Sequence, residues 1–179
     1  MEIKTVLLDS PMIERALIRI SHEIAEKNKG VSNVVILGIA RGGIPMSNKI
    51  AENIKKIENF EVPVGEIDIT LYRDDRKDNS IGPILNGTKI DFSIEDKDVV
   101  ICDDVLYTGR TVRAGIEAIF KFGRPRSIQL AVLIDRGHRE LPIRADYVGK
   151  NVPTSREEEV VVDFIGNESK AVIINKKSN

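Results

Sequence analysis

Apolar residues near the start of the chain recur at the spacing of a helix. Five of them form one apolar stripe with the period that a half-buried helix requires: Ile13, Ala16, Leu17, Ile20 and Ile24. Ser10 is the expected N-cap, Pro11 the first helical position and Gly30 the stop signal. The opposite side of this helix is polar and by itself indicates solvation, with Arg15, Arg19, His22 and Glu26.

Continuous apolar runs further along the chain predict strands, and the first is apolar enough to be buried on both faces of a sheet. The strands are expected at residues 34–39, 62–70, 98–102 and 127–135, with a β-rich ending at 157–175. Helices are expected at residues 44–57 and 111–122. This alternation predicts an α/β fold with a mainly parallel central sheet flanked by helices.

Residues 71–87 interrupt the alternation. They are polar and include Gly82 and Pro83, so they predict a long loop. Long loops in compact domains are usually functional, and we expect this one to cover a site. The 179 residues contain no internal repeat or linker, so residues 1–179 are expected to form one domain.

Composition and charge restrict the class of protein. Hydrophobic residues make up 41% and charged residues 31% of the chain, as in soluble globular proteins. No apolar run approaches the ~20 residues that span a bilayer, and the start resembles no secretory signal, so we expect a cytoplasmic protein without a membrane partner. The single cysteine, Cys102, cannot form an internal disulfide. Because the net charge is -1, any bound polyanion needs a local basic cluster.

Residues 99–111 form the most informative motif. An apolar strand leads into Asp103 and Asp104, and a short turn with Thr108 and Thr111 leads into a helix. Such a turn can direct backbone N–H groups, two hydroxyls and the partial positive charge of a helix N-terminus at a monophosphate. The adjacent carboxylates suit the hydroxyls of a ribose, or Mg²⁺ bound to a pyrophosphate. The motif indicates a site for a phosphorylated ribose, and the alternative is a capped helix beside a solvated acid pair.

The motif has neither the spacing of a Walker A loop nor that of the dinucleotide fingerprint G-x-G-x-x-G. It resembles the phosphoribosyl pyrophosphate (PRPP) signature of the type I phosphoribosyltransferases. Residues 65–75, 99–115 and 128–151 resemble one bacterial branch of that family, in which a uracil phosphoribosyltransferase also regulates the pyr genes of pyrimidine biosynthesis. The likeness covers residues 16–155. It implies the type I phosphoribosyltransferase fold, with a small hood region and a flexible loop.

The resemblance implies roles in the reaction of uracil with PRPP, which gives UMP and diphosphate. The implied catalytic residues are Asp103, Asp104 and Arg41. These three bind PRPP and UMP together with a larger set: Gly42, Val105, Leu106, Tyr107, Thr108, Gly109, Arg110, Thr111 and Arg136. The implied contacts of the uracil ring are Tyr147 and Val148, and those at the base of the flexible loop are Tyr72, Arg73 and Asp74. Mg²⁺ enters with PRPP, and its candidate protein ligands are the two aspartates.

Two details of this site lead to further expectations. Gly43 follows Gly42 in the pyrophosphate loop, and we expect the extra glycine to make this loop more mobile. Tyr107 stands where many purine enzymes of the family have an aspartate. A tyrosine with an ordinary pKa of about 10 is a poor general base at neutral pH. We therefore expect Tyr107 to shape the site rather than to abstract a proton.

The resemblance also implies a second activity, the UMP-responsive binding of a stem-loop in the pyr mRNA leader, which attenuates transcription. Residues 124–156 contain seven Lys and Arg against three Asp and Glu, a local positive excess that suits RNA phosphates. The implied RNA contacts are Arg19, His22, Lys27, His138, Arg139, Arg144 and Lys150. We expect Arg139→Ala to weaken RNA binding and to leave turnover intact. A homodimer or higher homo-oligomer is also implied.

Two other functions stay open at this point. The first is a plain phosphoribosyltransferase, for example for a purine base, in which the basic segment is only solvated surface. The second is a sensor without catalysis that uses the nucleotide pocket for regulation alone. Substrate tests with uracil, hypoxanthine and guanine distinguish these functions from one another.

Overall fold

The computed structural model describes residues 3–70, 87–164 and 168–175. Helices and strands alternate along these residues in the following order: β1 (Ile3–Leu8), α1 (Ser10–Lys27), β2 (Val34–Ile39), α2 (Gly43–Glu58), β3 (Val64–Ile67), β4 (Asp98–Leu106), α3 (Arg110–Ile119), β5 (Ser127–Asp135), β6 (Tyr147–Asn151), β7 (Glu158–Asp163) and β8 (Lys170–Asn175).

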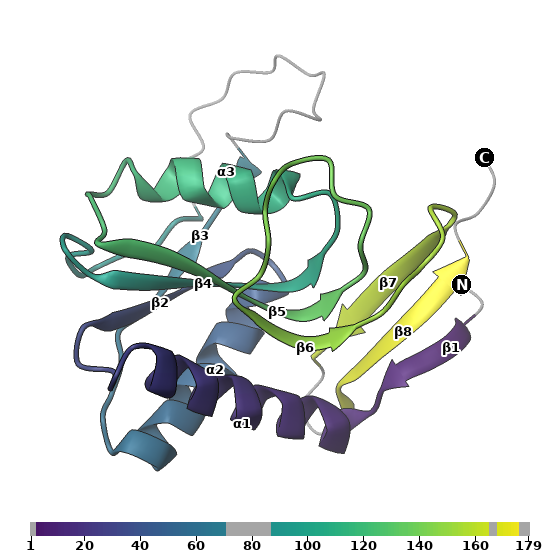
Figure 1. Cartoon of the computed structure of the whole chain (residues 1–179), viewed down its shortest axis with the longest axis horizontal. Helices are drawn as coiled ribbons and strands as arrows, with labels where there is room; N and C mark the ends of the chain where they lie inside the picture. Colours follow the sequence, from purple (N-terminus) through teal and green to yellow (C-terminus); the bar gives the residue numbers. More distant parts are fainter. Residues whose placement is uncertain (1–2, 71–86, 165–167, 176–179) are drawn as a thin grey trace.

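Five strands form a central sheet in the order β3-β2-β4-β5-β6, and every neighbouring pair is parallel. α1 and α2 cover one face of this sheet, and α3 covers the other (Figure 1). β2 is buried at every position, because a parallel strand between two helical layers has no side toward water. The predicted α/β fold with a mainly parallel sheet is confirmed.

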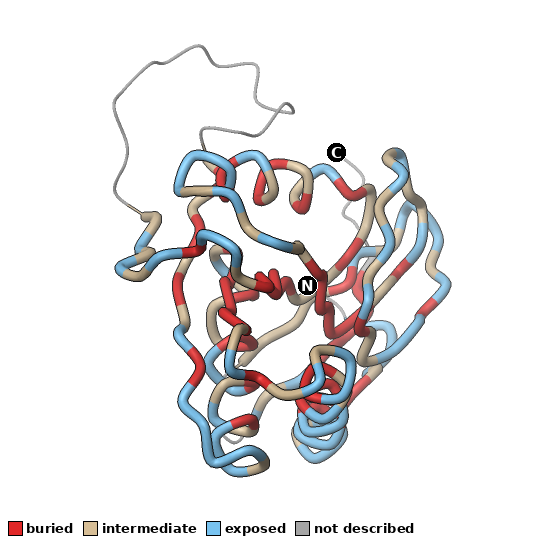
Figure 2. The backbone as a smooth tube through the Cα atoms, turned by 60° about the vertical axis from the view of Figure 1, so that its left-hand side comes forward, coloured by how far each residue is buried: buried red, intermediate tan, exposed pale blue. Residues whose placement is uncertain are grey.

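Buried residues line the central strands and the inner faces of the helices (Figure 2). All five residues of the predicted apolar stripe in α1 are buried, so the prediction for this helix is confirmed. Each Ile or Leu buried in this way stabilises the fold by roughly 2 kcal/mol relative to an exposed side chain. The hydrophobic effect therefore fixes which side of α1 faces solvent.

A second, antiparallel sheet has the order β1-β8-β7. It lies beside the central sheet, close to the ends of β5 and β6 (Figure 1). Val160 of β7, together with Ala171 and Ile173 of β8, belongs to the same hydrophobic cluster as the inner faces of α1 and α2. We refer to this small sheet as the hood, and shared apolar packing attaches it to the main body.

The ends of two elements differ from the predicted ones. Asp9, and not Ser10, caps α1, because the Asp9 side chain accepts a hydrogen bond from the N–H of Met12 at 2.9 Å. β4 continues through both aspartates of the motif to Leu106, because its pairing with β5 continues as far as Asp135. The acid pair is consequently part of the strand and not of the turn after it.

The sequence pattern predicted short edge elements poorly. β1 and β6 were not predicted, and both lie at the edges of their sheets. β3 contains four residues where a strand over 62–70 was expected. α3 ends at Ile119 rather than at residue 122. Partner strands and following turns set these ends, and a local hydrophobic pattern does not contain that information.

The part of the chain that the structure describes includes no helix that is both long enough and apolar enough to span a membrane. Residues 71–86 of the expected covering loop lie outside the described residues. Cys102 is buried in β4, and this burial raises the pKa of its thiol. Cys102 is therefore a small core residue.

Candidate functional site

The carboxyl end of β4 contains the two aspartates of the motif. Asp103 is buried, with 6% of its surface exposed, whereas Asp104 is half-buried. The N–H of Asp104 donates to Oδ1 of Asp103 at 3.0 Å, and the N–H of Val105 donates to Oδ1 of Asp104 at 2.9 Å. Burial, together with the nearby charge of Asp104, raises the pKa of Asp103 well above its usual range. The pair thus combines one carboxyl that resists ionisation with one that is open to water.

Hydrogen bonds from the segment that follows β5 support the turn after β4. Gly109 has a φ of 95°, in the left-handed region that favours glycine, and α3 begins at the next residue. Nη1 of Arg139 donates to the carbonyl of Tyr107 at 2.7 Å, and the N–H of Glu140 donates to the carbonyl of Thr108 at 2.9 Å. These bonds hold the turn at the N-terminus of α3. Helix N-termini of this kind bind anions.

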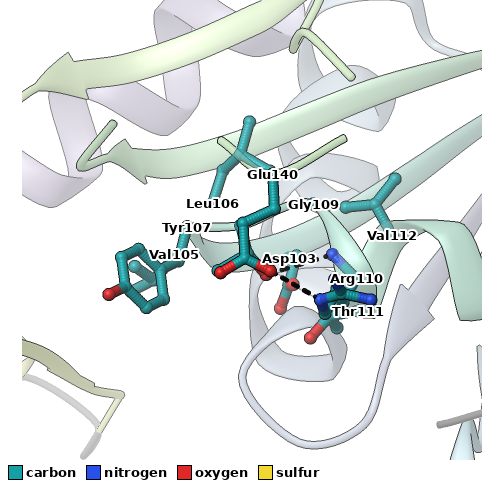
Figure 3. Close-up of a pocket in the computed structure, with 10 residues that line it drawn as sticks. Asp103, Val105, Leu106, Tyr107, Gly109, Arg110, Thr111, Val112 and Glu140 are labelled. Atoms are coloured by element: carbon teal, nitrogen blue, oxygen red, sulfur yellow. Dashed lines mark hydrogen bonds and ion pairs between the residues drawn. The ribbon is translucent and has the colours of Figure 1, made fainter. Parts of the chain in front are cut away.

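Two adjoining cavities lie at this edge of the sheet. The first, here the turn cavity, has a volume of about 320 Å³ (Figure 3) and is lined by Asp103, residues 105–112 and Glu140. The second, here the loop cavity, has a volume of about 610 Å³ and is lined by residues 40–42, 68–70, 103–105 and 111. Asp103, Val105 and Thr111 line both cavities. The aspartate pair therefore stands between two spaces, one beside a helix N-terminus and the other beside Arg41.

The loop after β2 forms one wall of the loop cavity. The peptide bond Ala40–Arg41 is cis. A Cβ atom at Gly42 would lie 2.2 Å from the carboxyl carbon of Asp104, so a larger residue there requires the carboxylate or the loop to move. Gly43 is the first residue of α2, and a Cβ atom there would lie 2.1 Å from the carbonyl oxygen of Cys102. Gly43 is therefore packed into the start of the helix, and the expected mobility of the loop stays a prediction.

Three polar residues that line these cavities were missed in the sequence. Asp68 and Thr70 follow β3 at the same sheet edge, and the N–H of Thr70 donates to Oδ1 of Asp68 at 2.9 Å. Their position after a parallel strand was a signal that could have identified them. Glu140 enters the turn cavity from the basic segment, and no local pattern marks it. Outside the described residues lie the expected loop residues Tyr72, Arg73 and Asp74.

The chain as a whole is similar to known proteins. The family model described as "Phosphoribosyl transferase domain" matches residues 5–164. The "Bifunctional protein PyrR" of Acetivibrio thermocellus is 63% identical over 159 residues, which cover 89% of this chain and 86% of that protein. The protein of the same name from Clostridium novyi is 54% identical over 178 residues, which cover 98% of this chain and 100% of that protein. The chain belongs to the PyrR branch of the phosphoribosyltransferase family.

Solved structures show the same fold. The hypoxanthine phosphoribosyltransferase of Trypanosoma cruzi matches this phosphoribosyltransferase with a TM-score of 0.70 over 98% of both chains, at 19% identity. A hypoxanthine-guanine phosphoribosyltransferase of Bacillus anthracis matches with a TM-score of 0.66 over 86% of both chains, also at 19% identity. At these identities the likeness concerns the fold alone and carries no information about the base.

Arg136 connects the central sheet to the segment before the hood strand β7. It is only 4% exposed, and its guanidinium donates to the carbonyls of Ser155 and Glu158 at 2.9 and 2.8 Å and to Oγ1 of Thr154 at 3.0 Å. The guanidinium carbon also lies 4.0 Å from the centre of the Tyr107 ring. Arg136 lines neither cavity, and the structure places it behind Tyr107, where it orients that ring.

The two candidate base-binding residues lie on opposite faces of β6, because side chains alternate along a strand. Tyr147 is 2% exposed and packs in the cluster on the α1 side, where its hydroxyl donates to Oε1 of Gln129 at 2.6 Å. Its burial raises the pKa of Tyr147 to about 12. Val148 packs against the cluster on the α3 side. Of the two, only Val148 lies on the face of the sheet that α3 covers.

Four of the seven RNA candidates lie where α1 passes the edge strand β6. These residues are called the α1–β6 surface: Arg19, His22, Lys27 and Lys150. Arg19 donates to two consecutive carbonyls of β6, at 3.0 and 2.8 Å, and Lys27 pairs with Asp146 at 2.5 Å. Both side chains remain about half exposed, at 48% and 49%. Their positive charges therefore remain accessible to a polyanion in solvent.

The other three RNA candidates lie on the segment that supports the turn. The ring of His138 meets the ring of Tyr107 edge-on, with 5.8 Å between the centroids. Arg139 is only 24% exposed, and its guanidinium donates to the carbonyls of Tyr107 and Ile143. Arg144 is exposed. Because Arg139 holds the turn, its substitution is no longer expected to leave turnover intact.

Proposed function

We propose that the chain transfers the phosphoribosyl group of PRPP to uracil, and that UMP promotes its binding to a stem-loop in the pyr mRNA leader, which attenuates transcription. One observation supports the enzymatic half above all. The aspartate pair, the turn before α3 and the Arg41–Gly42 loop meet at two adjoining cavities. Identities of 54–63% to PyrR proteins support uracil and RNA over a plain purine enzyme.

Each part of the site has a role in the displacement of diphosphate from C1′ of PRPP. The amides of the turn and the hydroxyls of Thr108 and Thr111 bind the 5′-phosphate, and the aspartate pair binds the ribose hydroxyls. Arg41 and the backbone at Gly42 bind the diphosphate. Its bond to C1′ breaks as a uracil ring nitrogen bonds to that carbon, and the proton of that nitrogen passes to the departing diphosphate or to water. Since the transition state has oxocarbenium character, the site acts by positioning the reactants and stabilising the leaving group.

Mg²⁺ fits this site as a companion of the diphosphate. Asp68 and Asp104 line the loop cavity, and carboxylate oxygens are preferred ligands of Mg²⁺. Asp104 suits the ion better than Asp103, because the buried Asp103 resists ionisation. Within the described residues, no three metal-ligating side chains gather at one point, so substrate oxygens would supply most of the ligands. When bound, the ion neutralises charge on the leaving group.

Tyr107 shapes the base site in this proposal. Arg136 packs on the face of its ring and His138 on its edge, and Tyr107→Phe keeps both contacts. We expect turnover to fall by less than about tenfold, whereas the loss of a general base costs about 100-fold or more. Steady-state rates and PRPP binding are measured together. Abolished turnover with intact PRPP binding would show that the hydroxyl has a chemical role.

The enzymatic half is tested with PRPP, Mg²⁺ and each of three bases: uracil, hypoxanthine and guanine. We expect UMP from uracil and no product from the two purines. Asp104→Asn serves as the site control and should lose turnover with uracil. Turnover with a purine base would identify a plain purine phosphoribosyltransferase. No turnover with any base would identify a sensor without catalysis.

The regulatory half is tested by gel shift with a labelled pyr leader stem-loop at fixed, near-physiological salt, because salt alone changes such affinities strongly. UMP should increase the affinity for the leader and not for a scrambled stem-loop. Arg144→Ala should weaken leader binding more than Arg124→Ala, a matched loss of one exposed arginine outside the implied contacts. Equal binding of leader and scrambled RNA would reject the regulatory half and leave only the enzymatic half of the proposal.

The proposal extends to assembly and location. We propose that residues 1–179 act as one domain, because one hydrophobic cluster joins the hood to the central sheet. We also propose a homodimer or higher homo-oligomer, supported by Ile3 and Val6 of β1, which are 48% and 57% exposed. Light scattering after gel filtration measures the assembly directly. We propose a cytoplasmic location as well, since substrates and an mRNA of this kind are found there.

A further inference from the structure

An acidic side chain lines the cavity where the phosphate of the ligand is expected. Glu140 lines the turn cavity, and its Oε2 accepts a hydrogen bond from Nε of Arg110 at 2.7 Å, as Figure 3 shows. Arg110 is the first residue of α3, so the carboxylate lies at the N-terminus of this helix. The N–H of Glu140 is bonded to the carbonyl of Thr108, within the turn itself. The carboxylate thus lies beside the groups proposed to bind the 5′-phosphate.

Stability alone does not account for this carboxylate. The side chains of Arg110 and Glu140 are 43% and 52% exposed, and exposed ion pairs stabilise proteins by about 0–1 kcal/mol. The first turn of α3 has no acidic residue of its own, so Glu140 supplies the negative charge that this helix N-terminus favours. A bound phosphate would supply the same charge at the same place. Glu140 and a phosphate would therefore lie close together at this helix N-terminus and repel each other.

We propose that Glu140 is an internal competitor of the ligand phosphate. The proposal rests on the nucleotide site proposed above and assigns to Glu140 the regulation of ligand affinity at that site. A ligand with a 5′-phosphate displaces the carboxylate from Arg110 and takes its place at the N-terminus of α3. The protein therefore binds UMP and PRPP more weakly than the remaining groups of the site would allow. A nucleoside, which has no phosphate, does not meet this competition.

The competition also couples nucleotide binding to RNA binding. Glu140 follows His138 and Arg139, and all three belong to the segment whose backbone and side chains hold the turn. When the carboxylate leaves Arg110, one of the bonds between this segment and the start of α3 is lost. The segment then becomes freer to present its basic side chains to RNA. Linkage requires the reciprocal effect, so RNA should strengthen UMP binding by the same factor.

The test compares Glu140→Gln with Glu117→Gln. Glu117 pairs with Arg113 on α3 at 2.9 Å, its side chain is 48% exposed, and it lines neither cavity, so it controls for the loss of one exposed charge. Calorimetry gives the affinities for UMP and for uridine. For Glu140→Gln we expect UMP to bind about three- to tenfold more tightly, since a like charge a few ångströms away costs about 1 kcal/mol in water. Uridine affinity should not change, and Glu117→Gln should match the wild type for both ligands.

The outcomes separate this inference from the proposed function. Unchanged or weaker UMP binding by Glu140→Gln, with a wild type that prefers UMP to uridine, overturns the competition and leaves the nucleotide site intact. A wild type that binds UMP no better than uridine overturns both. In gel shifts, UMP should enhance leader binding less in Glu140→Gln than in the wild type. If UMP enhances leader binding equally in the variant and the wild type, the proposed coupling to RNA binding is rejected. Because Glu140 is half exposed, the variant is expected to fold.

Discussion

Gly42 has no room for a side chain, because a Cβ atom would lie 2.2 Å from the carboxyl carbon of Asp104. Gly42→Ala must push either the loop or the carboxylate away from its position. Misplacement on this scale costs about 100-fold in well-oriented reactions. We expect kcat/KM for PRPP to fall by at least about tenfold.

Gly30→Ala is the control for Gly42→Ala. Gly30 has a φ of 104°, and a Cβ atom there would meet nothing within 4 Å, so its substitution strains the backbone without touching the site. It should lower stability by about 1 kcal/mol and leave kcat/KM unchanged. Steady-state kinetics and thermal melting measure both variants. Wild-type kinetics for Gly42→Ala would show that the close approach to Asp104 is dispensable.

The buried Asp103 makes stability depend on pH. The pKa of Asp103 is raised in the folded state, so folding favours its protonated form. The stability that this preference contributes is fully present below the unfolded pKa of about 3.9 and is lost as the pH rises through the folded pKa. At pH 8 the ionised form destabilises the protein, and Asp103→Asn removes that charge. We expect Asp103→Asn to melt at a higher temperature than the wild type, by about 2–4 °C for each kcal/mol of destabilisation that is removed. The difference between the two melting temperatures should become smaller toward pH 4.

Asp98→Asn should change the melting temperature in the opposite direction to Asp103→Asn. The hydrogen bond from Arg126 lowers the pKa of Asp98, so this contribution is present above the unfolded pKa and is lost as the pH falls through the folded pKa. At pH 8, Asp98→Asn therefore lowers the melting temperature while Asp103→Asn raises it. Thermal melts at a series of pH values test the pair. A shared sign at pH 8 would show that burial does not penalise the Asp103 carboxylate.

At the scale of elements, the segment from 137 to 143 determines the shape of the phosphate-binding turn. Arg139 bonds to the carbonyl of Tyr107 at 2.7 Å and to that of Ile143 at 2.9 Å. Arg139→Ala should raise the KM for PRPP by at least about tenfold, because a hydrogen bond from a charged donor is worth about 1.5 kcal/mol or somewhat more. Arg144→Ala removes an exposed charge close to this segment and should leave this KM unchanged. Identical kinetics in the two variants would exclude the supporting role of Arg139.

At the scale of the whole molecule, Arg136 joins the two sheets. Its guanidinium is buried and donates three hydrogen bonds to the segment before β7 and to the first residue of that strand. Arg136→Lys keeps the charge and loses the fork of donors, so we expect the free energy of unfolding to fall by about 2–3 kcal/mol. Urea unfolding measures this loss, with the exposed Arg124→Lys as the matched control. A loss below about 0.5 kcal/mol, the usual range for surface substitutions, would show that packing alone attaches the hood.

The sequence by itself determined the elements whose pattern is local. The stripe of α1, the buried run of β2 and the strand β5 follow from hydrophobic period and run length, and these do not depend on partners. The motif at 99–111 also predicted a site for a phosphorylated ribose, because strand, acid pair, turn and helix start are adjacent in the chain. Resemblance to one family then narrowed the base and added RNA as a partner.

The tertiary structure decided everything that depends on which side chains meet. It placed Tyr147 in the core and Val148 on the other face, it engaged Arg136 and Arg139 in internal hydrogen bonds, and it brought Glu140 into the turn cavity. Edge strands such as β1 and β6 likewise form only against their neighbours. The physical reason is the same in each case. Hydrogen bonds and charge contacts between residues far apart in sequence leave no period in the chain, so only folding reveals them.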